Sequence, residues 1–267
     1  MPVKKIQKKC INDKFYTKSE VSDNCIAIMK EFIPDGVLFI EPSAGSGSFS
    51  SKIQCYAYDI EPENENIQKQ DFLLLENQFQ GQICVFGNPP FGERNHLTNS
   101  FIRKSIDIGA RYIAFILPSV YKKFTMQKVF PSDWNLITEY TLPDNSFVLN
   151  SIPYHVPCVF QIWERNSELP NLREVRQPSE CSDFSFGNRS DSDIFVFGAA
   201  PTKIIRPDEV LPTNRGYFLK SKVDIKELCD KIASVDWKAA ARSSVSGGVA
   251  WFSRDEFVKH YINQNGA

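Results

Sequence analysis

The sequence predicts an α/β fold: a Rossmann-like, seven-stranded sheet, parallel except for its last strand, with helices on both faces and a small α+β appendage after it. Short, continuous apolar runs such as residues 37–40 and 83–86 are typical of parallel strands that are buried on both faces. Segments with apolar residues at helical spacing lie between such runs, as in chains built from βαβ units. Several runs end in glycine, proline or an acidic residue, at the strand ends where such sheets bind ligands.

The composition fits a globular protein with one large domain, or one large and one small. The chain has 267 residues, of which 42% are hydrophobic and 24% are charged. Its net charge of -1 gives no general attraction for nucleic acid, so such binding would need a local basic patch. The seven cysteines include no C-x-x-C pair, and we find no signal peptide or long apolar span. We therefore expect a cytoplasmic protein with reduced thiols, no metal site and no membrane contact.

The predicted strands and helices alternate along the first part of the chain. One helix follows residue 17, and another covers residues 95–109. The last two strands should form a hairpin, which makes the final strand antiparallel. The seven predicted strands are residues 37–40, 55–58, a segment ending before residue 70, and residues 83–86, 112–117, 136–142 and 157–163.

The rest of the chain is predicted to be a linker and an appendage. Residues 164–183 contain prolines, serines and mixed charges, which is typical of a linker. We accordingly divide the chain into a domain of residues 1–165 and an appendage of residues 166–267. Expected in the appendage are strands at 194–197 and 216–219, helices at 223–232 and 253–262, and a turn at Gly247-Gly248.

The stretch Asn88-Pro89-Pro90-Phe91 ends the apolar run of residues 83–86 abruptly. Neither proline has an N–H for a strand ladder, and both have a fixed φ, so the strand must stop in a rigid tip. Such a tip suits methyl transfer to the exocyclic amine of a base, which is a poor nucleophile. The Asn88 side chain and the Pro89 carbonyl could accept its two N–H bonds, while Phe91 stacks on the base.

A glycine-containing loop follows the run of residues 37–40. It reads Glu41-Pro42-Ser43-Ala44-Gly45-Ser46-Gly47-Ser48-Phe49. Gly45 and Gly47 allow a tight turn and close approach to a ligand, but the third glycine of a dinucleotide-binding loop is missing. This argues against a nicotinamide cofactor. Asp59, at the end of the second predicted strand, is placed to accept hydrogen bonds from ribose hydroxyls.

These two motifs resemble those of class I S-adenosylmethionine-dependent amino-methyltransferases, over residues 13–165. Residues 88–91 are similar to motif IV, (D/N/S)PP(Y/F), and residues 41–49 are similar to motif I. The resemblance implies that Glu41 meets the methionine amine of the cofactor, and that the segment before the first strand closes over it. The implied S-adenosylmethionine-binding residues are Tyr16, Thr17, Glu41, Pro42, Ser43, Ala44, Gly45, Gly47, Asp59, Ile60, Asp71, Phe72 and Asn88.

Several of these assignments have simpler alternatives. Thr17 or Ser19 could instead cap the following helix, and Asp71 could cap another. The resemblance also implies an aromatic residue that packs on the target base opposite Phe91. Phe147 is the candidate, with a place in the core as the alternative.

The resemblance implies a methyltransferase that acts on N6 of adenine in nucleic acid, on a base flipped out or unpaired. DNA is favoured, because the motif order and the appendage resemble enzymes of restriction-modification type. RNA, a protein glutamine, or a role as an inactive cofactor-binding partner subunit are the alternatives. Lys203, Arg206 and Arg215 are the expected substrate contacts in the appendage. The lysines within residues 1–14 form either a solvated tail or an arm that touches phosphates.

Overall fold

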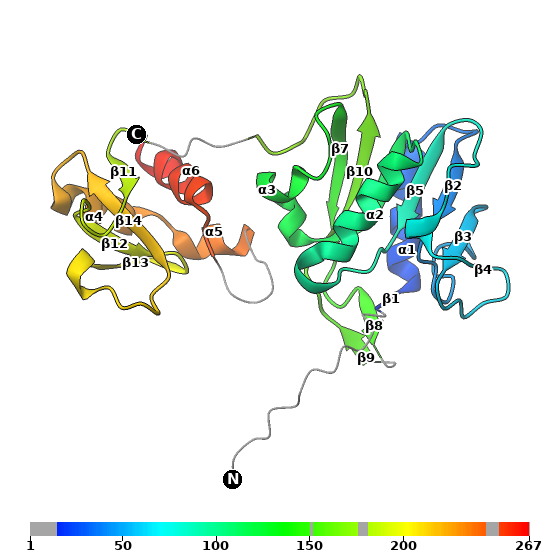
Figure 1. Ribbon diagram of the computed structural model, residues 1–267, viewed down its shortest axis with the longest axis horizontal. Coiled ribbons are helices and arrows are strands. Elements are labelled where there is room, and N and C mark those ends of the chain that lie inside the picture. Colours follow the sequence, from blue (N-terminus) through cyan, green and yellow to red (C-terminus); the bar gives the residue numbers. More distant parts are fainter. Residues whose placement is uncertain (1–14, 150–151, 176–180, 244–250, 267) are drawn as a thin grey trace, which may run out of the picture. The chain divides into compact units, whose positions relative to one another are not determined.

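The computed structural model describes residues 15–149, 152–175, 181–243 and 251–266. The lysine-rich arm of residues 1–14 and the Gly247-Gly248 turn lie outside these described residues. The chain divides into two compact units, Met1–Arg173 and Glu174–Ala267 (Figure 1). Each unit has its own hydrophobic core and is described by itself.

The first unit is built on the predicted seven-stranded sheet, in the order β4-β3-β2-β5-β6-β10-β7. The strands β2, β3, β4, β5 and β6 run parallel to their neighbours, whereas β10 is antiparallel to both β6 and β7. This is a Rossmann-like α/β fold, so the predicted fold class is confirmed. The strands are β2 (Leu38–Glu41), β3 (Tyr56–Asp59), β4 (Gln68–Lys69), β5 (Ile83–Gly87), β6 (Tyr112–Pro118), β7 (Trp134–Thr141) and β10 (Cys158–Arg165).

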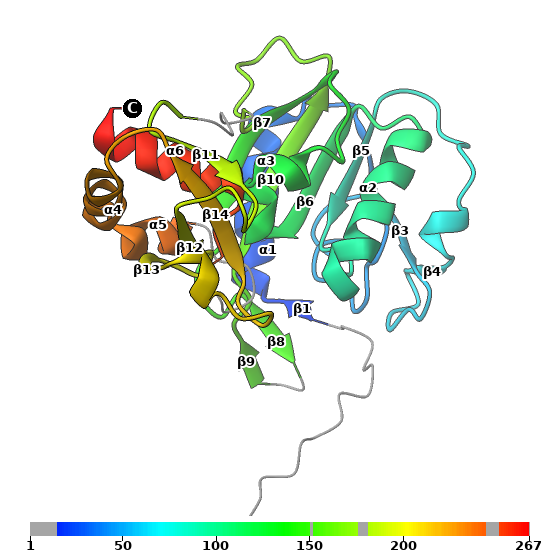
Figure 2. The ribbon, with the colours of Figure 1, turned by 60° about the vertical axis from the view of Figure 1, so that its left-hand side comes forward.

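Helices cover both faces of this sheet, as Figures 1 and 2 show. Successive side chains of a strand point to opposite faces, so Val85 packs on one side of β5 and Phe86 on the other. Both are fully buried, which explains the uninterrupted apolar run in the sequence. The helical segments are α1 (Ser19–Phe32), α2 (His96–Asp107), α3 (Phe124–Gln127), η1 (Phe72–Leu74), η2 (Glu93–Asn95) and η3 (Ser119–Lys122).

A second, three-stranded sheet was not predicted. It joins β1 (Tyr16–Thr17), β8 (Phe147–Leu149) and β9 (Ile152–Tyr154) in the order β1-β8-β9. Thr17 pairs with Phe147 in an antiparallel register, and the Lys18 amide donates to the Ser146 carbonyl at 3.0 Å. Segments far apart in the sequence therefore meet beside the main sheet (Figure 1). Thr17 lies in this strand, and Lys18 is the residue before α1, so the alternative of a Thr17 or Ser19 cap is wrong.

The second unit is an antiparallel sheet with helices packed on it, in the order β11-β14-β12-β13. In its core, Trp237 stacks on Phe257 with ring centroids 5.1 Å apart and meets Phe252 edge-on at 5.0 Å. Its elements are β11 (Phe184–Gly187), β12 (Ile194–Phe197), β13 (Ala200–Ile205), η4 (Pro207–Glu209), β14 (Gly216–Ser221), α4 (Ile225–Ser234), α5 (Trp237–Ser243) and α6 (Arg254–Asn265).

Candidate functional site

The candidate site lies at the carboxyl ends of β2, β3 and β5. The chain passes from β2 to β3 on one side of β2, and β5 pairs on the other side. Open α/β sheets bind ligands where the strand order reverses in this way. The loops that begin at Glu41, Asp59 and Asn88 all start at this edge, so the fold brings the predicted motifs together.

The glycine loop after β2 is tied to the end of β3. Gly45 and Gly47 have φ values of 56° and 93°, a region that favours glycine. The Gly45 amide donates to Asp59 Oδ2 at 2.8 Å, and the Glu61 amide donates to Asp59 Oδ1 at 2.8 Å. Asp59 therefore holds the loop in place, and it keeps further lone pairs as acceptors.

Glu41 is a buried carboxyl at the start of this loop, only 2% exposed. Its Oε2 accepts from the Ser50 amide at 2.9 Å. Gly87 leaves room for it, since a Cβ added to Gly87 would lie 3.2 Å from Glu41 Cγ. Burial is the main cause that raises the pKa of Glu41 to about 8. Nearby Asp59 contributes in the same direction, and the hydrogen bonds from Ser50 oppose it. A cationic group bound here would supply the counter-charge that favours the carboxylate.

Asn88 sits at the tip of β5 with its side-chain amide held on one side only. Its Nδ2 donates to the Phe15 carbonyl and to Thr17 Oγ1, both at 3.3 Å. Its backbone carbonyl accepts from Ser43 Oγ at 3.2 Å. The Oδ1 atom is buried and has no partner among the described residues. Because the Phe15 carbonyl can only accept, the nitrogen must face it, and the unpaired acceptor faces the other way.

The two prolines and Phe91 continue the tip. The Pro90 carbonyl accepts from Thr98 Oγ1 at 3.1 Å, which anchors the loop to α2. Phe91 is half-buried, and its ring centroid lies 6.3 Å from that of Phe15. The motif is thus a rigid loop, fixed at both ends, that carries one half-buried aromatic ring.

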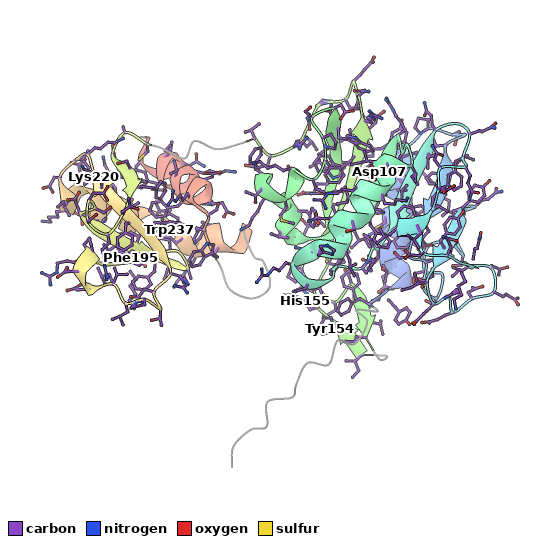
Figure 3. The ribbon with its side chains drawn as sticks, viewed as in Figure 1. Asp107, Tyr154, His155, Phe195, Lys220 and Trp237 are labelled. Atoms are coloured by element: carbon purple, nitrogen blue, oxygen red, sulfur yellow. The ribbon has the colours of Figure 1, made fainter. Side chains whose placement is uncertain are left out.

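Phe147, predicted to pack on a target base, is instead a core residue with 0% exposure. It opens β8 as the register partner of Thr17, so its ring points into the first unit. This corresponds to the alternative that the sequence left open. The exposed aromatic side chain of the hairpin is Tyr154, 42% exposed and labelled in Figure 3. Tyr154 stacks on Phe15 with centroids 5.1 Å apart and an interplanar angle of 15°.

The remaining predicted cofactor residues differ in their surroundings. The Tyr16 ring lies against Gly45, and its hydroxyl donates to Glu63 Oε1 at 2.5 Å. Ile60 is 58% exposed at the end of β3, free to contact a ligand. Asp71 accepts from the Leu73 amide at 2.9 Å and caps η1, as its alternative predicted.

Phe72 is buried at 1% exposure and stacks on Phe101 with centroids 5.4 Å apart. The ring belongs to the core between the sheet and α2, so its contact with the cofactor stays a prediction that this burial does not support. Pro42 and Ala44 are buried in the loop after β2. Four residues that contact the site were not predicted from the sequence, namely Ser50, Glu63, Gly87 and Tyr154. Only Gly87 carried a signal, as a glycine directly before Asn88.

The three predicted substrate contacts lie in the second unit. Lys203 Nζ lies 4.6 Å from the centre of the Phe197 ring. Arg206 forms ion pairs with Glu209 at 3.1 Å and Asp208 at 3.5 Å. Arg215 donates to the Pro212 carbonyl at 2.9 Å. Arg206 is thus already neutralised by its neighbours, whereas Lys203 and Arg215 have aromatic and backbone contacts.

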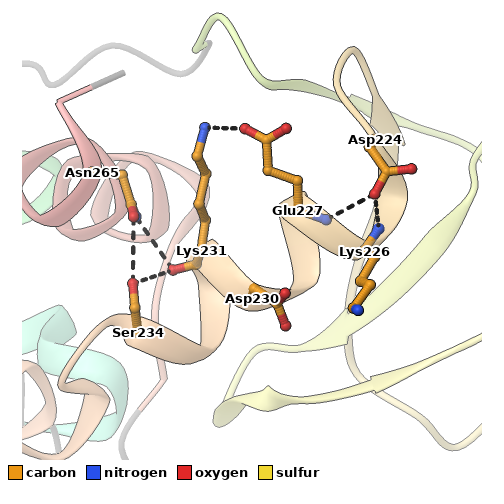
Figure 4. Close-up of a pocket in the computed structure, with 7 residues that line it drawn as sticks. All are labelled: Asp224, Lys226, Glu227, Asp230, Lys231, Ser234 and Asn265. Carbon is orange, nitrogen blue, oxygen red and sulfur yellow. Dashed lines mark hydrogen bonds and ion pairs between the residues drawn. The ribbon is translucent and has the colours of Figure 1, made fainter.

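None of the predicted site residues lines a polar pocket on α4 (Figure 4). Lys231 and Glu227 form an ion pair of 2.8 Å there. No group of three or more His, Cys, Asp or Glu side chains within the described ranges could hold a metal ion. In the same part of the chain, no helix is long and apolar enough to cross a membrane. The pocket is lined by Asp224, Lys226, Glu227, Asp230, Lys231, Ser234 and Asn265.

Comparisons with known proteins give remote structural likenesses. No protein-family model matches the chain, and no curated protein matches it significantly. A structure of a type I restriction-modification system is 15% identical to this chain, with a TM-score of 0.42. The match covers 56% of this chain and 42% of the other chain. A modification subunit of a putative type I restriction enzyme from Vibrio vulnificus is 12% identical, with a TM-score of 0.42. The match covers 78% of this chain and 55% of the other chain.

A putative RNA methyltransferase from Pyrococcus horikoshii shares 12% identity with a TM-score of 0.44. It covers 59% of this chain and 90% of its own. The chain spans about half or less of the length of the two restriction-modification structures. At these identities and TM-scores, the likenesses identify neither a family nor an activity for this chain.

Proposed function

We propose that the protein transfers the methyl group of S-adenosylmethionine to N6 of adenine in nucleic acid, with DNA favoured over RNA. The observation that carries the proposal is the buried, unpartnered Oδ1 atom of Asn88. A buried acceptor without a partner is costly, and native proteins rarely keep one without a reason. A bound amine would supply the missing hydrogen bond.

The residues beside Asn88 fit S-adenosylmethionine, which supplies an electrophilic methyl group when bound. Glu41 is a buried carboxyl suited to a cationic amine. The loop through Gly45 and Gly47 allows close backbone approach, and Asp59 offers acceptors to ribose hydroxyls. Ile60 is exposed where an adenine ring would lie. Phe72 is not part of this set.

In the proposed reaction, the chain acts by orientation rather than by a charged base. Asn88 Oδ1 and the Pro89 carbonyl accept the two N–H bonds of the amine, which directs its lone pair toward the methyl group. After methyl transfer the nitrogen is positively charged, and it releases a proton to solvent. Phe91 is half-buried in the same rigid loop and is available for stacking on the base. Its ring lies next to that of Phe15, which stacks on Tyr154.

We further propose that the second unit binds the nucleic acid, through Lys203 and Arg215 more than through Arg206. Arg206 already has two carboxylate partners, so a phosphate gains less from it. The favoured DNA substrate rests on the motif order followed by a separate unit. Three alternatives would each give a different result in the same assay. They are an RNA substrate, a protein glutamine substrate and an inactive partner subunit.

The test is methyl transfer from labelled S-adenosylmethionine to DNA, RNA and protein from a host that lacks this gene. Label in N6-methyladenine of DNA is expected. Asn88→Ala should reduce turnover by on the order of 10²-fold while cofactor binding persists, because one preorganised polar contact is lost. Asn24→Ala, on the exposed side of α1, is the matched control and should behave like the parent. Label in RNA alone or in glutamine alone would replace DNA as the proposed substrate. No label in any of the three would refute the proposed methyltransferase activity.

A further inference from the structure

We propose that Thr17 is a positioning residue for Asn88, which together with the Phe15 carbonyl holds the catalytic amide in the orientation that leaves Oδ1 free. This inference rests on the proposed function. It gives Thr17 a role toward the substrate side of the site, in addition to the cofactor contact expected from the sequence.

The geometry of the amide leads to this role. Asn88 Nδ2 donates to two acceptors, the Phe15 carbonyl and Thr17 Oγ1, and both bonds measure 3.3 Å. An Asn side chain has two nearly isosteric orientations about its last bond, with oxygen and nitrogen exchanged. In the exchanged orientation, the Asn88 oxygen would face the Phe15 carbonyl, which repels it. The Phe15 carbonyl thus selects the orientation in which the acceptor faces the open side, and the Thr17 hydroxyl adds a second hydrogen bond that holds the amide there.

The two clamping groups are themselves held by distant parts of the chain. Thr17 is 7% exposed and pairs with Phe147 across β1 and β8. The Phe15 ring lies among three aromatic rings, 5.1 Å from Tyr154, 6.3 Å from Phe91 and 6.4 Å from Phe147. The buried ring of Phe147 anchors β8 in the core, and β8 pairs with β1, the strand that carries Thr17.

Thr17→Val is the matched test, because valine keeps the shape and the β-branching and removes only the hydroxyl. At saturating cofactor, turnover should fall about tenfold, whatever change calorimetry finds in the cofactor Kd. Thr17→Ser retains the hydroxyl and should restore most of the turnover. Turnover of Thr17→Val equal to the parent would overturn the inference. So would a loss that higher cofactor concentrations repair, since that would show a cofactor contact alone.

A second measurement does not depend on activity. The side-chain amide protons of Asn88, observed by NMR, should exchange slowly in the parent and several-fold faster in Thr17→Val. Equal exchange in both proteins would overturn the positioning role. If the parent transfers no methyl group but its Asn88 amide still exchanges more slowly than that of Thr17→Val, the proposed reaction is refuted and the positioning role of Thr17 stands.

Discussion

Ending the chain after Arg165 should produce a much less stable fragment than ending it after Arg173. Residues 166–173 were predicted as part of a linker, yet they pack on the first unit. β7 is the last strand of the sheet, and its Leu136 amide donates to Asn171 Oδ1 at 3.1 Å. The Leu172 amide donates back to the Leu136 carbonyl at 2.8 Å. This segment therefore covers a sheet edge that would otherwise be open to aggregation.

Arg173 adds a second set of contacts. Its guanidinium donates to four backbone carbonyls near the end of α3, and it lies 5.6 Å from the centre of the Trp163 ring. With about 1 kcal/mol for each of the two neutral hydrogen bonds and about 2 kcal/mol for each of the four guanidinium bonds, the lost contacts amount to about 10 kcal/mol. Domains of this size are stable by about 5–15 kcal/mol. The shorter fragment should therefore be close to unfolding.

Urea unfolding of the fragments 1–173 and 1–165, followed by tryptophan fluorescence, measures the difference. The longer fragment should unfold cooperatively, and the shorter one should unfold at a much lower midpoint or be recovered insoluble. Arg173→Ala in the longer fragment should give an intermediate midpoint, which separates the guanidinium contacts from the covered edge. Equal midpoints for the two fragments would refute the reasoning and leave residues 166–173 as a linker.

Three further changes test the candidate site. Asp59→Ala removes the acceptor that holds the Gly45 loop, so the S-adenosylmethionine Kd should rise about tenfold by calorimetry, and an unchanged Kd would refute this. Burial raises the pKa of Glu41 to about 8, so the folded state binds more protons between about pH 4.5 and pH 8 and loses stability as pH rises through that range. Glu41→Gln should flatten this slope in urea titrations, and an unchanged slope would contradict it. Phe147→Ala should cost about 3–5 kcal/mol of stability, whereas Tyr154→Ala should mainly raise the substrate KM; equal stability losses would contradict the distinction.

The main sheet could be predicted because its signals are local. Buried parallel strands such as β5 are apolar on both faces, and they end where Asn88 or Glu41 begins a loop. The positions of Phe147 and Phe72 could not be predicted in the same way. Phe147 and Tyr154 are register partners and lie on the same face of the small sheet, but Phe147 is on the central strand β8 and Tyr154 on the edge strand β9. Which of them is exposed therefore depends on the long-range pairing of β1 with β8, which the composition of the loop does not reveal.

Contacts between distant polar residues carried no signal at all. Asn171 and Arg173 look like ordinary linker residues, because a hydrogen bond to a backbone carbonyl leaves no pattern in the sequence. The pairing of Thr17 with Phe147 joins segments about 130 residues apart, and nothing local in either segment specifies the other. Such long-range contacts hold the site in place, while short motifs supply its chemical groups.

The unpartnered oxygen of Asn88 shows why both kinds of information are needed. A buried acceptor without a hydrogen bond costs about 1–3 kcal/mol, so a free amide would turn to satisfy it. The prolines that follow fix the backbone, and Phe15 and Thr17 already occupy Nδ2, so the side chain has no better orientation. In the proposed reaction, the cost of holding this oxygen unpaired is met during folding. An amine that arrives then finds an acceptor that needs no reorganisation, which is the condition for electrostatic preorganisation to accelerate a reaction.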